Sequence, residues 1–204
     1  MTGLDPRHPM VIDARVLGRR AGAMTEIRRA IPVTEDTGPI GTQLVAVQPG
    51  GVLDLELRLE CVLEGVLASG TVRAEADGTC VRCLEPARVP VAATFQELYA
   101  YADRAAHHHQ VGDDEADARV LVGDLLDLEP VLRDAIVPAL PFQPRCRPDC
   151  PGLCDRCGEP LAQGGEHKHD EPDPRWAVLA GLATPSGTSP APDPTGPGEQ
   201  EKRN

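Results

Sequence analysis

The sequence has very few aromatic residues: two Phe, two Tyr and one Trp among 204 residues. Proteins usually bind the bases of single-stranded RNA by stacking them on aromatic side chains, so such platforms are scarce here. The chain also has no excess of basic residues, since its formal net charge is −12. A protein that grips nucleic-acid phosphates over a wide surface is usually basic. Both shortages favour another protein as the main partner.

Long apolar runs are also missing. No run approaches the ~20 residues that a membrane-spanning helix needs, and the first ten residues contain no stretch typical of a signal peptide. We therefore expect a soluble, cytoplasmic protein without membrane contact. Disulfides are rare in that compartment. The chain is long enough for one core with a small satellite.

Six of the seven cysteines, by contrast, fall into two clusters, one formed by Cys80 and Cys83 and the other by Cys146, Cys150, Cys154 and Cys157. The Cys-x2-Cys spacing lets two thiolates reach one ion from a single tight turn, and a glycine after the second cysteine suits the left-handed residue of that turn. Two such pairs would form a closed tetrahedral Zn²⁺ site, which contributes folding energy rather than chemistry.

Two other interpretations of the cysteines are weaker. A thioredoxin-like redox pair would open a helix after a strand, whereas Leu84-Glu-Pro86 and a strand-like run follow Cys83. Disulfides would need an oxidising compartment. Zinc is therefore the favoured interpretation. The seventh cysteine, Cys61, lies in an apolar strand pattern and is expected to be an ordinary buried thiol.

A strict alternation of apolar and polar residues over Val52–Val62 predicts a half-buried strand. Val66–Ala76 predicts a second strand that forms a hairpin with the first and leads to Cys80. The alternation resumes from Val89 to Glu97, so the first cysteine turn should join two strands. Shorter strands are predicted at Val11–Asp13 and Met24–Val33.

The best helix candidate is Leu125–Leu140, with Asp127 as its cap, Pro130 in its first turn, and Pro138 and Pro141 ending it. A turn of helix is also predicted from Ala14 to Arg20, capped by Asp13 and stopped by Gly22. A further short amphipathic helix is predicted at Asp173–Leu182.

These elements predict an α+β fold, an antiparallel β-sheet core with a packed helix over residues 11–141. A cysteine-rich, zinc-ribbon-like module with the closing helix is predicted over 142–182, and a Pro- and Gly-rich disordered tail over 183–204. Residues 103–118 carry His107, His108 and His109 beside a run of acids. The three histidines could bind a metal ion, but no second group of ligands lies at a suitable spacing from them. These residues are therefore interpreted as a flexible acidic loop.

Basic residues gather near the N-terminus, where residues 1–33 hold six Arg against three acidic residues. If the protein touches nucleic acid, the expected contacts are Arg15, Arg19, Arg20, Arg28 and Arg29. The alternative, which we favour, is a solvated face whose Arg stems cover apolar surface.

Several motifs, in this order, resemble the YceD family, the large ribosomal RNA subunit accumulation proteins. They are Cys80-Val-Arg-Cys83-Leu-Glu-Pro, the stretch from Asp124 to Pro141, Cys150-Pro-Gly-Leu-Cys154-Asp-Arg-Cys157-Gly, and Asp173-Pro-Arg-Trp176-Ala-Val-Leu. The opening Val11-Ile-Asp-Ala-Arg-Val-Leu-Gly-Arg-Arg is similar to that of actinobacterial-type members. The resemblance runs from about Val11 to Leu182.

The resemblance implies a non-enzymatic bacterial factor needed for accumulation of large-subunit ribosomal RNA and for ribosome assembly. Many members carry a further Cys-x-Cys where this chain has His167 and His169, and imidazole can replace thiolate on zinc. Cys80 and Cys83 supply only half a site, and only the end of the predicted long helix, where Cys146 begins the second cluster, is expected nearby to complete it. The resulting hypothesis is two sites of four donors, the first with Cys80, Cys83, Cys146 and Cys150, the second with Cys154, Cys157, His167 and His169. The alternative is one site made by the second cysteine cluster, which leaves Cys80 and Cys83 as a free dithiol.

Two functions remain open at this stage. The first is an assembly factor that contacts a ribosomal or rRNA-processing protein, with weak contact to rRNA. The second is a zinc-ribbon regulator that binds nucleic acid through the N-terminal Arg group. An enzyme acting on a small-molecule substrate is not expected, because a catalytic zinc keeps an open water position that thiolate-rich closed sites lack.

Overall fold

The computed structural model describes residues 3–104, 119–162, 169 and 175. The chain divides into two compact units, Met1–Gly165 and Glu166–Asn204, and the fold described below belongs to the first. The histidine-rich part of the predicted loop, the tail and nearly all of the predicted closing helix lie outside the described residues. No helix in the described part of the chain has the length and apolarity to cross a membrane.

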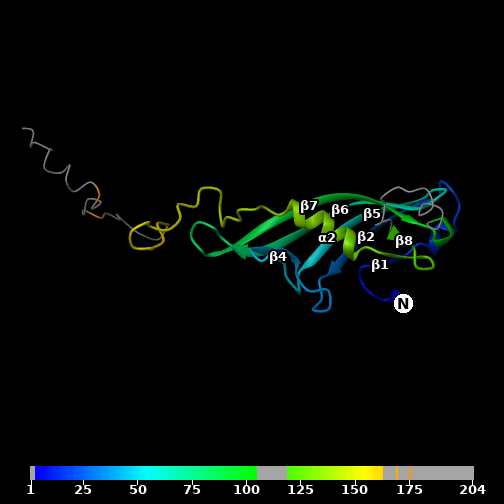
Figure 1. Ribbon diagram of the computed structural model, residues 1–204, viewed down its shortest axis with the longest axis horizontal. Helices are drawn as coiled ribbons and strands as arrows, with labels where there is room; N and C mark the ends of the chain where they lie inside the picture. The colour runs from blue at the N-terminus through cyan, green and yellow to red at the C-terminus, as the bar shows by residue number, and fades with distance from the viewer. Residues whose placement is uncertain (1–2, 105–118, 163–168, 170–174, 176–204) are drawn as a thin grey trace, which may run out of the picture. The chain divides into compact units, whose positions relative to one another are not determined.

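The α+β prediction is confirmed, because an antiparallel sheet with a packed helix dominates the first unit (Figure 1). Four long strands, in the order β2-β5-β6-β7, form the body of the sheet. They are β2 (Met24–Pro32), β5 (Val52–Cys61), β6 (Gly65–Thr79) and β7 (Pro86–Ala100). Short strands β3 (Ile40–Gly41), β4 (Val45–Val47) and β8 (Arg119–Val120) extend it, and only the β7–β8 pair is parallel among the described pairs.

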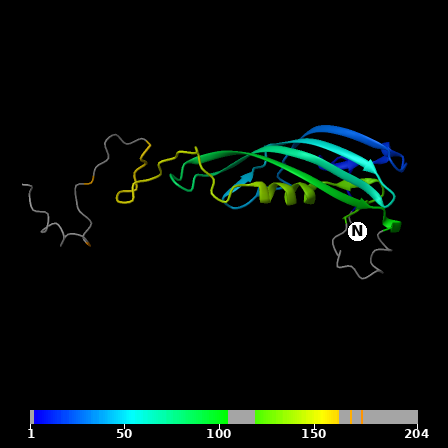
Figure 2. The ribbon, with the colours of Figure 1, turned by 90° about the horizontal axis from the view of Figure 1, so that it is seen from above.

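The core lies on one face of this sheet. As predicted, β5 alternates, and its inward side chains are at most 2% exposed: Leu53, Leu55, Leu57, Leu59 and Cys61. Helix α2 (Glu129–Ala139) covers this face with Val131, Leu132 and Ile136 (Figure 2). The opposite face carries the charged residues of the alternation, among them Asp54, Glu56 and Arg58, and is exposed.

The predicted helix Leu125–Leu140 is wrong over its first residues. Leu125–Asp127 forms strand β9, which pairs antiparallel with β1 (Val11–Asp13) in a separate two-stranded sheet. Helix α2 begins at Glu129, and its N-cap residue is Leu128, without a side-chain cap hydrogen bond, instead of the predicted Asp127. Asp127 lies one residue earlier, and its Oδ1 accepts from the Glu129 N–H at 3.0 Å. Pro138 lies inside the helix instead of ending it, and Leu140 is extended because Pro141 follows.

The predicted helical turn Ala14–Arg20 is also shorter than expected. It is a 3-10 helix, η1, over Arg15–Leu17, and the Arg15 N–H donates to Asp13 Oδ1 at 2.9 Å. Gly18 ends it in the left-handed conformation at φ 57°, four residues before the predicted stop. Strands β1 and β2 lie where the sequence predicts them.

The side chain of Arg133 ties α2 to a loop of the chain. Its guanidinium donates to the backbone oxygens of Thr37 and of Pro39, the latter at 2.9 Å. We expect Arg133→Ala to lower the free energy of unfolding by about 1.5–3 kcal/mol, because two carbonyls lose a charged donor. Urea denaturation measures this loss. Arg15→Ala, which breaks an exposed pair with Asp13, should cost less than about 1 kcal/mol; equal losses would contradict the role given to Arg133.

Candidate metal centre

The first cysteine pair sits in the tight turn between β6 and β7. These strands pair along their whole length, from Gly65 opposite Ala100 to Thr79 opposite Pro86, and so bring the turn to one end of the sheet. The Cys80 N–H donates to Glu85 O at 2.8 Å, and the Leu84 N–H donates to Cys80 O at 2.9 Å. Leu84 adopts the left-handed conformation at φ 62°. This geometry turns both cysteine side chains to the same side.

The second pair reaches this turn from the segment that follows α2. The Val81 N–H donates to Pro144 O at 3.0 Å, which places the segment against the hairpin turn. Gly152 is left-handed at φ 87°, and a Cβ there would lie 3.1 Å from Arg82 O. A side chain at this position would therefore be strained and crowded. The close approach of the two loops positions Cys146 and Cys150 beside Cys80 and Cys83.

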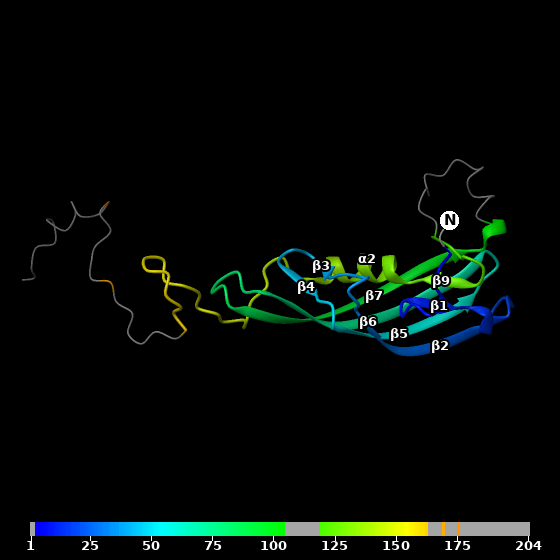
Figure 3. The same cartoon turned by 90° about the horizontal axis from the view of Figure 1, so that it is seen from below.

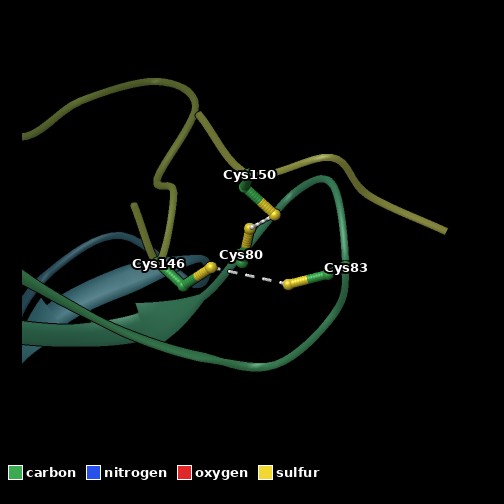
Figure 4. Close-up of side chains that lie close together, drawn as sticks. All are labelled: Cys80, Cys83, Cys146 and Cys150. Atoms are coloured by element: carbon green, nitrogen blue, oxygen red, sulfur yellow. Dashed lines mark hydrogen bonds between the residues drawn. The ribbon is translucent and has the colours of Figure 1, made fainter. Parts of the chain in front are cut away.

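The four sulfur atoms lie within 4.8 Å of one another (Figure 4). The Sγ atoms of Cys80 and Cys150 are 3.8 Å apart, and those of Cys83 and Cys146 are 3.6 Å apart. Four thiolates at about 2.3 Å from one ion in a tetrahedron would be about 3.8 Å from each other. A disulfide would bring two sulfurs to about 2.05 Å. The arrangement therefore fits one tetrahedrally bound metal ion, and not disulfides.

The thiols influence each other's ionisation. The pKa of Cys80 is lowered to about 6, chiefly by a hydrogen bond from the backbone N–H of Cys146. The pKa of Cys146 is raised to about 12 by desolvation and by the neighbouring thiols. A hydrogen bond from the Glu85 backbone N–H lowers the pKa of Cys83, but burial and the thiols of Cys80 and Cys150 outweigh it, so this pKa is also raised. Close thiolates repel, so a divalent cation would relieve this repulsion.

The turn at Cys154 repeats the backbone pattern of the turn at Cys80. The Cys154 N–H donates to Glu159 O at 2.8 Å, and the Gly158 N–H donates to Cys154 O at 2.9 Å. Gly158 is left-handed at φ 75°, the conformation predicted for a glycine after the second cysteine. The Arg156 N–H also approaches Cys154 Sγ at 3.4 Å. Cys154 and Cys157 thus occupy a second turn of the type that presents two thiolates to one ion.

The remaining predicted ligands belong to the other unit. His169 is exposed and lies in Glu166–Asn204, whereas His167 is outside the described residues. The second four-donor site therefore stays a prediction. Cys61 is apart from both clusters: it is 2% exposed, and its Sγ lies 3.1 Å from the hydroxyl of Tyr101.

The five N-terminal arginines do not form one surface. Arg15 pairs with Asp13, and Arg19 pairs with Asp124 at 3.0 Å while lying over the ring of Tyr101. Arg28 and Arg29 are adjacent in β2, so their side chains project to opposite faces of the sheet. Arg20 follows η1 and is exposed.

The fold and the cluster together define a small antiparallel-sheet protein in which four cysteines could hold a metal ion between a hairpin turn and a distant loop. The family model described as "Large ribosomal RNA subunit accumulation protein YceD" matches residues 68–183, more than half of the chain. This match covers both cysteine turns and α2. The chain belongs to the YceD family.

Curated relatives extend the similarity to most of the chain. Uncharacterized proteins of Mycobacterium bovis and Mycobacterium tuberculosis are each 45% identical over 177 residues, which covers 87% of this chain and 83% of theirs. An uncharacterized protein of Mycobacterium leprae is 40% identical over 177 residues, covering 87% and 79%. No solved structure matches the chain.

Proposed function

We propose that the protein is a non-enzymatic cytoplasmic factor that supports the accumulation of large-subunit ribosomal RNA and ribosome assembly, acting mainly through contacts with a ribosomal or rRNA-processing protein. The observation that carries this proposal is membership of a family named for large ribosomal RNA subunit accumulation, matched over residues 68–183.

The cysteine site supports a structural role for its metal, which we propose to be Zn²⁺. Tetrahedral four-sulfur sites select zinc or iron–sulfur centres, and the sulfur separations of 3.6 and 3.8 Å suit a single ion. When four thiolates fill the tetrahedron, no position remains for a water molecule. The site therefore serves to fix residues 142–153 against the hairpin turn, which favours a binding protein over an enzyme.

The surface beside this site supports a protein as the partner. Phe142 is 94% exposed, and it borders a hollow of about 560 Å³ whose lining includes Val89, Pro90 and Pro148. An exposed aromatic residue in an apolar rim is typical of protein contacts. The net charge of −12 also opposes wide contact with RNA phosphates. Arg15 and Arg19, two of the proposed RNA contacts, are already paired with carboxylates.

The proposal predicts that deletion of the gene lowers mature large-subunit rRNA while small-subunit rRNA stays near normal. Sucrose gradients of ribosomal subunits, with rRNA quantified in each fraction, measure this ratio. Wild-type protein should restore the ratio and Phe142→Ala should not, because it removes the exposed apolar contact. The matched control is Leu63→Ala, because Leu63 is 80% exposed in the turn at the opposite end of β6. This variant should restore the ratio of the two rRNAs.

Other outcomes would point elsewhere. Unchanged subunit profiles, including during slow growth in the cold, would contradict the assembly role. Changed transcript levels with a normal subunit ratio would favour the nucleic-acid-binding regulator. Tight, salt-resistant binding of the purified protein to bare rRNA would indicate that the protein acts through contacts with RNA and not through contacts with another protein.

A further inference from the structure

Strand β2 is the outermost long strand on one side of the sheet (Figure 3). Among the residues that the structure describes, it pairs with β5 alone, from Met24 opposite Glu60 to Pro32 opposite Val52. Within the described part of the chain, one edge of β2 is therefore open along nine residues. Open edges present unpaired backbone donors and acceptors, and proteins commonly cover or guard them.

The backbone groups at this edge can be assigned from the ladder. The Cys61 N–H donates to Ala23 O at 2.8 Å at one end, and the Val33 N–H donates to Gly51 O at 2.9 Å at the other. Because hydrogen-bonded pairs recur at every second residue of an antiparallel ladder, the odd-numbered residues of β2 face β5. The even-numbered residues direct their N–H and C=O groups to the open edge: Met24, Glu26, Arg28 and Ala30.

Two of these edge residues carry opposite charges, and each lies across the ladder from an opposite charge on β5, Glu26 from Arg58 and Arg28 from Glu56. Glu26 and Arg28 are exposed and take part in none of the ion pairs among the described residues. Their side chains share the outer face of the sheet, because they are two residues apart in a strand. Edge residues of one charge sign would repel the same residues of a second copy and so protect the edge. A Glu and an Arg two residues apart can instead pair with the Arg and the Glu of a second copy.

We propose that two copies of this chain join edge to edge through β2, antiparallel and around a two-fold axis at Ile27. The backbone requires even-numbered residues opposite even-numbered ones, because only these direct their N–H and C=O groups to the open edge. A two-fold axis at residue 26, 27 or 28 meets this requirement. An axis at Glu26 places it opposite the partner's Glu26, and an axis at Arg28 places it opposite the partner's Arg28. With the axis at Ile27, Glu26 faces the partner's Arg28 and Arg28 faces the partner's Glu26. Because like charges opposite one another destabilise a ladder, charge selects this register.

The same register suits the apolar residues of the strand. On the inner face, half-buried Ile27 lies opposite the partner's Ile27. On the outer face, Met24, which is 54% exposed, lies opposite the partner's Ala30. The two sheets become one continuous sheet with a closed, isologous interface. The contact is small and each chain carries a charge of −12, so the dimer is of the weak, concentration-dependent class.

Sedimentation velocity of the full chain over a range of concentrations tests the dimer. Wild type should show a monomer–dimer equilibrium. Glu26→Arg and Arg28→Glu should each raise the dissociation constant about tenfold or more, because each sets like charges opposite one another twice. An equimolar mixture of the two variants should form heterodimers, because each introduced charge then faces an opposite charge. Glu75→Arg, on the outer face of β6 away from the edge, should dimerise like wild type.

Thermal unfolding of each variant controls for loss of fold. If a charge variant does not fold, Ala30→Pro provides a second test, because it removes an outward N–H without touching a bond to β5; it should also be monomeric. A wild type that stays monomeric at every concentration overturns the proposal. A dimer that both charge variants leave unchanged overturns it equally, and so does a mixture of variants that stays monomeric.

Discussion

Cys83→Ser is expected to remove one bound metal ion per chain and to release residues 142–153 from the hairpin turn. Serine is a poor ligand for a thiolate-selective ion, and three thiolates do not close the tetrahedron. Structural zinc sites contribute apparent binding free energies of about 10–16 kcal/mol. That is as much as the whole stability of a typical domain. Metal analysis of purified protein and the rate of proteolysis within residues 142–153 measure the two effects.

The sheet itself should survive this substitution. Three of the site's cysteines, Cys80, Cys83 and Cys150, form their own small buried cluster with Ala87, separate from the main core. The circular dichroism of the strands should therefore stay near that of wild type. Cys61→Ser is the matched control, since Cys61 is buried but lies outside both cysteine turns; its metal content should not change. Unaltered metal content in Cys83→Ser would rule out the site formed by Cys80, Cys83, Cys146 and Cys150.

Leu132→Ala should have the opposite effects to Cys83→Ser: it should lower the stability of the fold and leave the metal content unchanged. Leu132 is fully buried where α2 meets the sheet, so its truncation should lower the free energy of unfolding by about 2–5 kcal/mol. Urea denaturation measures the loss, and the folded variant should retain its metal. Val137→Ala, on the same helix and 37% exposed, should change stability by about 0.5 kcal/mol or less. Similar losses in both variants would contradict the placement of α2.

The sheet and the first cysteine turn were predictable because their signals are local. The alternation of apolar and polar residues in β5 indicates a strand with one buried face. The spacing of Cys80 and Cys83 indicates a turn that presents two thiolates. The hairpin between β6 and β7 was also predictable, because its strands follow each other directly in the sequence on either side of the Cys80–Cys83 turn. The grouping of Cys80 and Cys83 with Cys146 and Cys150 followed from the need to complete half a site.

Other features depend on distant partners and left no local signal. Leu125–Asp127 is apolar enough for a helix or a strand, and its pairing with β1, more than 110 residues earlier, decides for strand. The early end of η1 involves Arg19, a non-glycine residue at φ 50° that is held by Asp124 and lies over Tyr101. Likewise, Leu84 takes the left-handed position that Gly158 occupies in the other cysteine turn, so no glycine marks the first turn.

The separation of the two halves of the cysteine site has a consequence for protein synthesis. Cys146 follows Cys83 by 63 residues, which at about 5–20 residues per second corresponds to a delay of roughly 3–13 s. During this interval, the hairpin between β6 and β7 has ample time to form, because hairpins form in about 1–10 μs. The nascent chain therefore presents two thiols from a finished turn before their partners exist. A metal ion bound at this stage would have only two of its four ligands, and the site would become complete only after translation has passed α2.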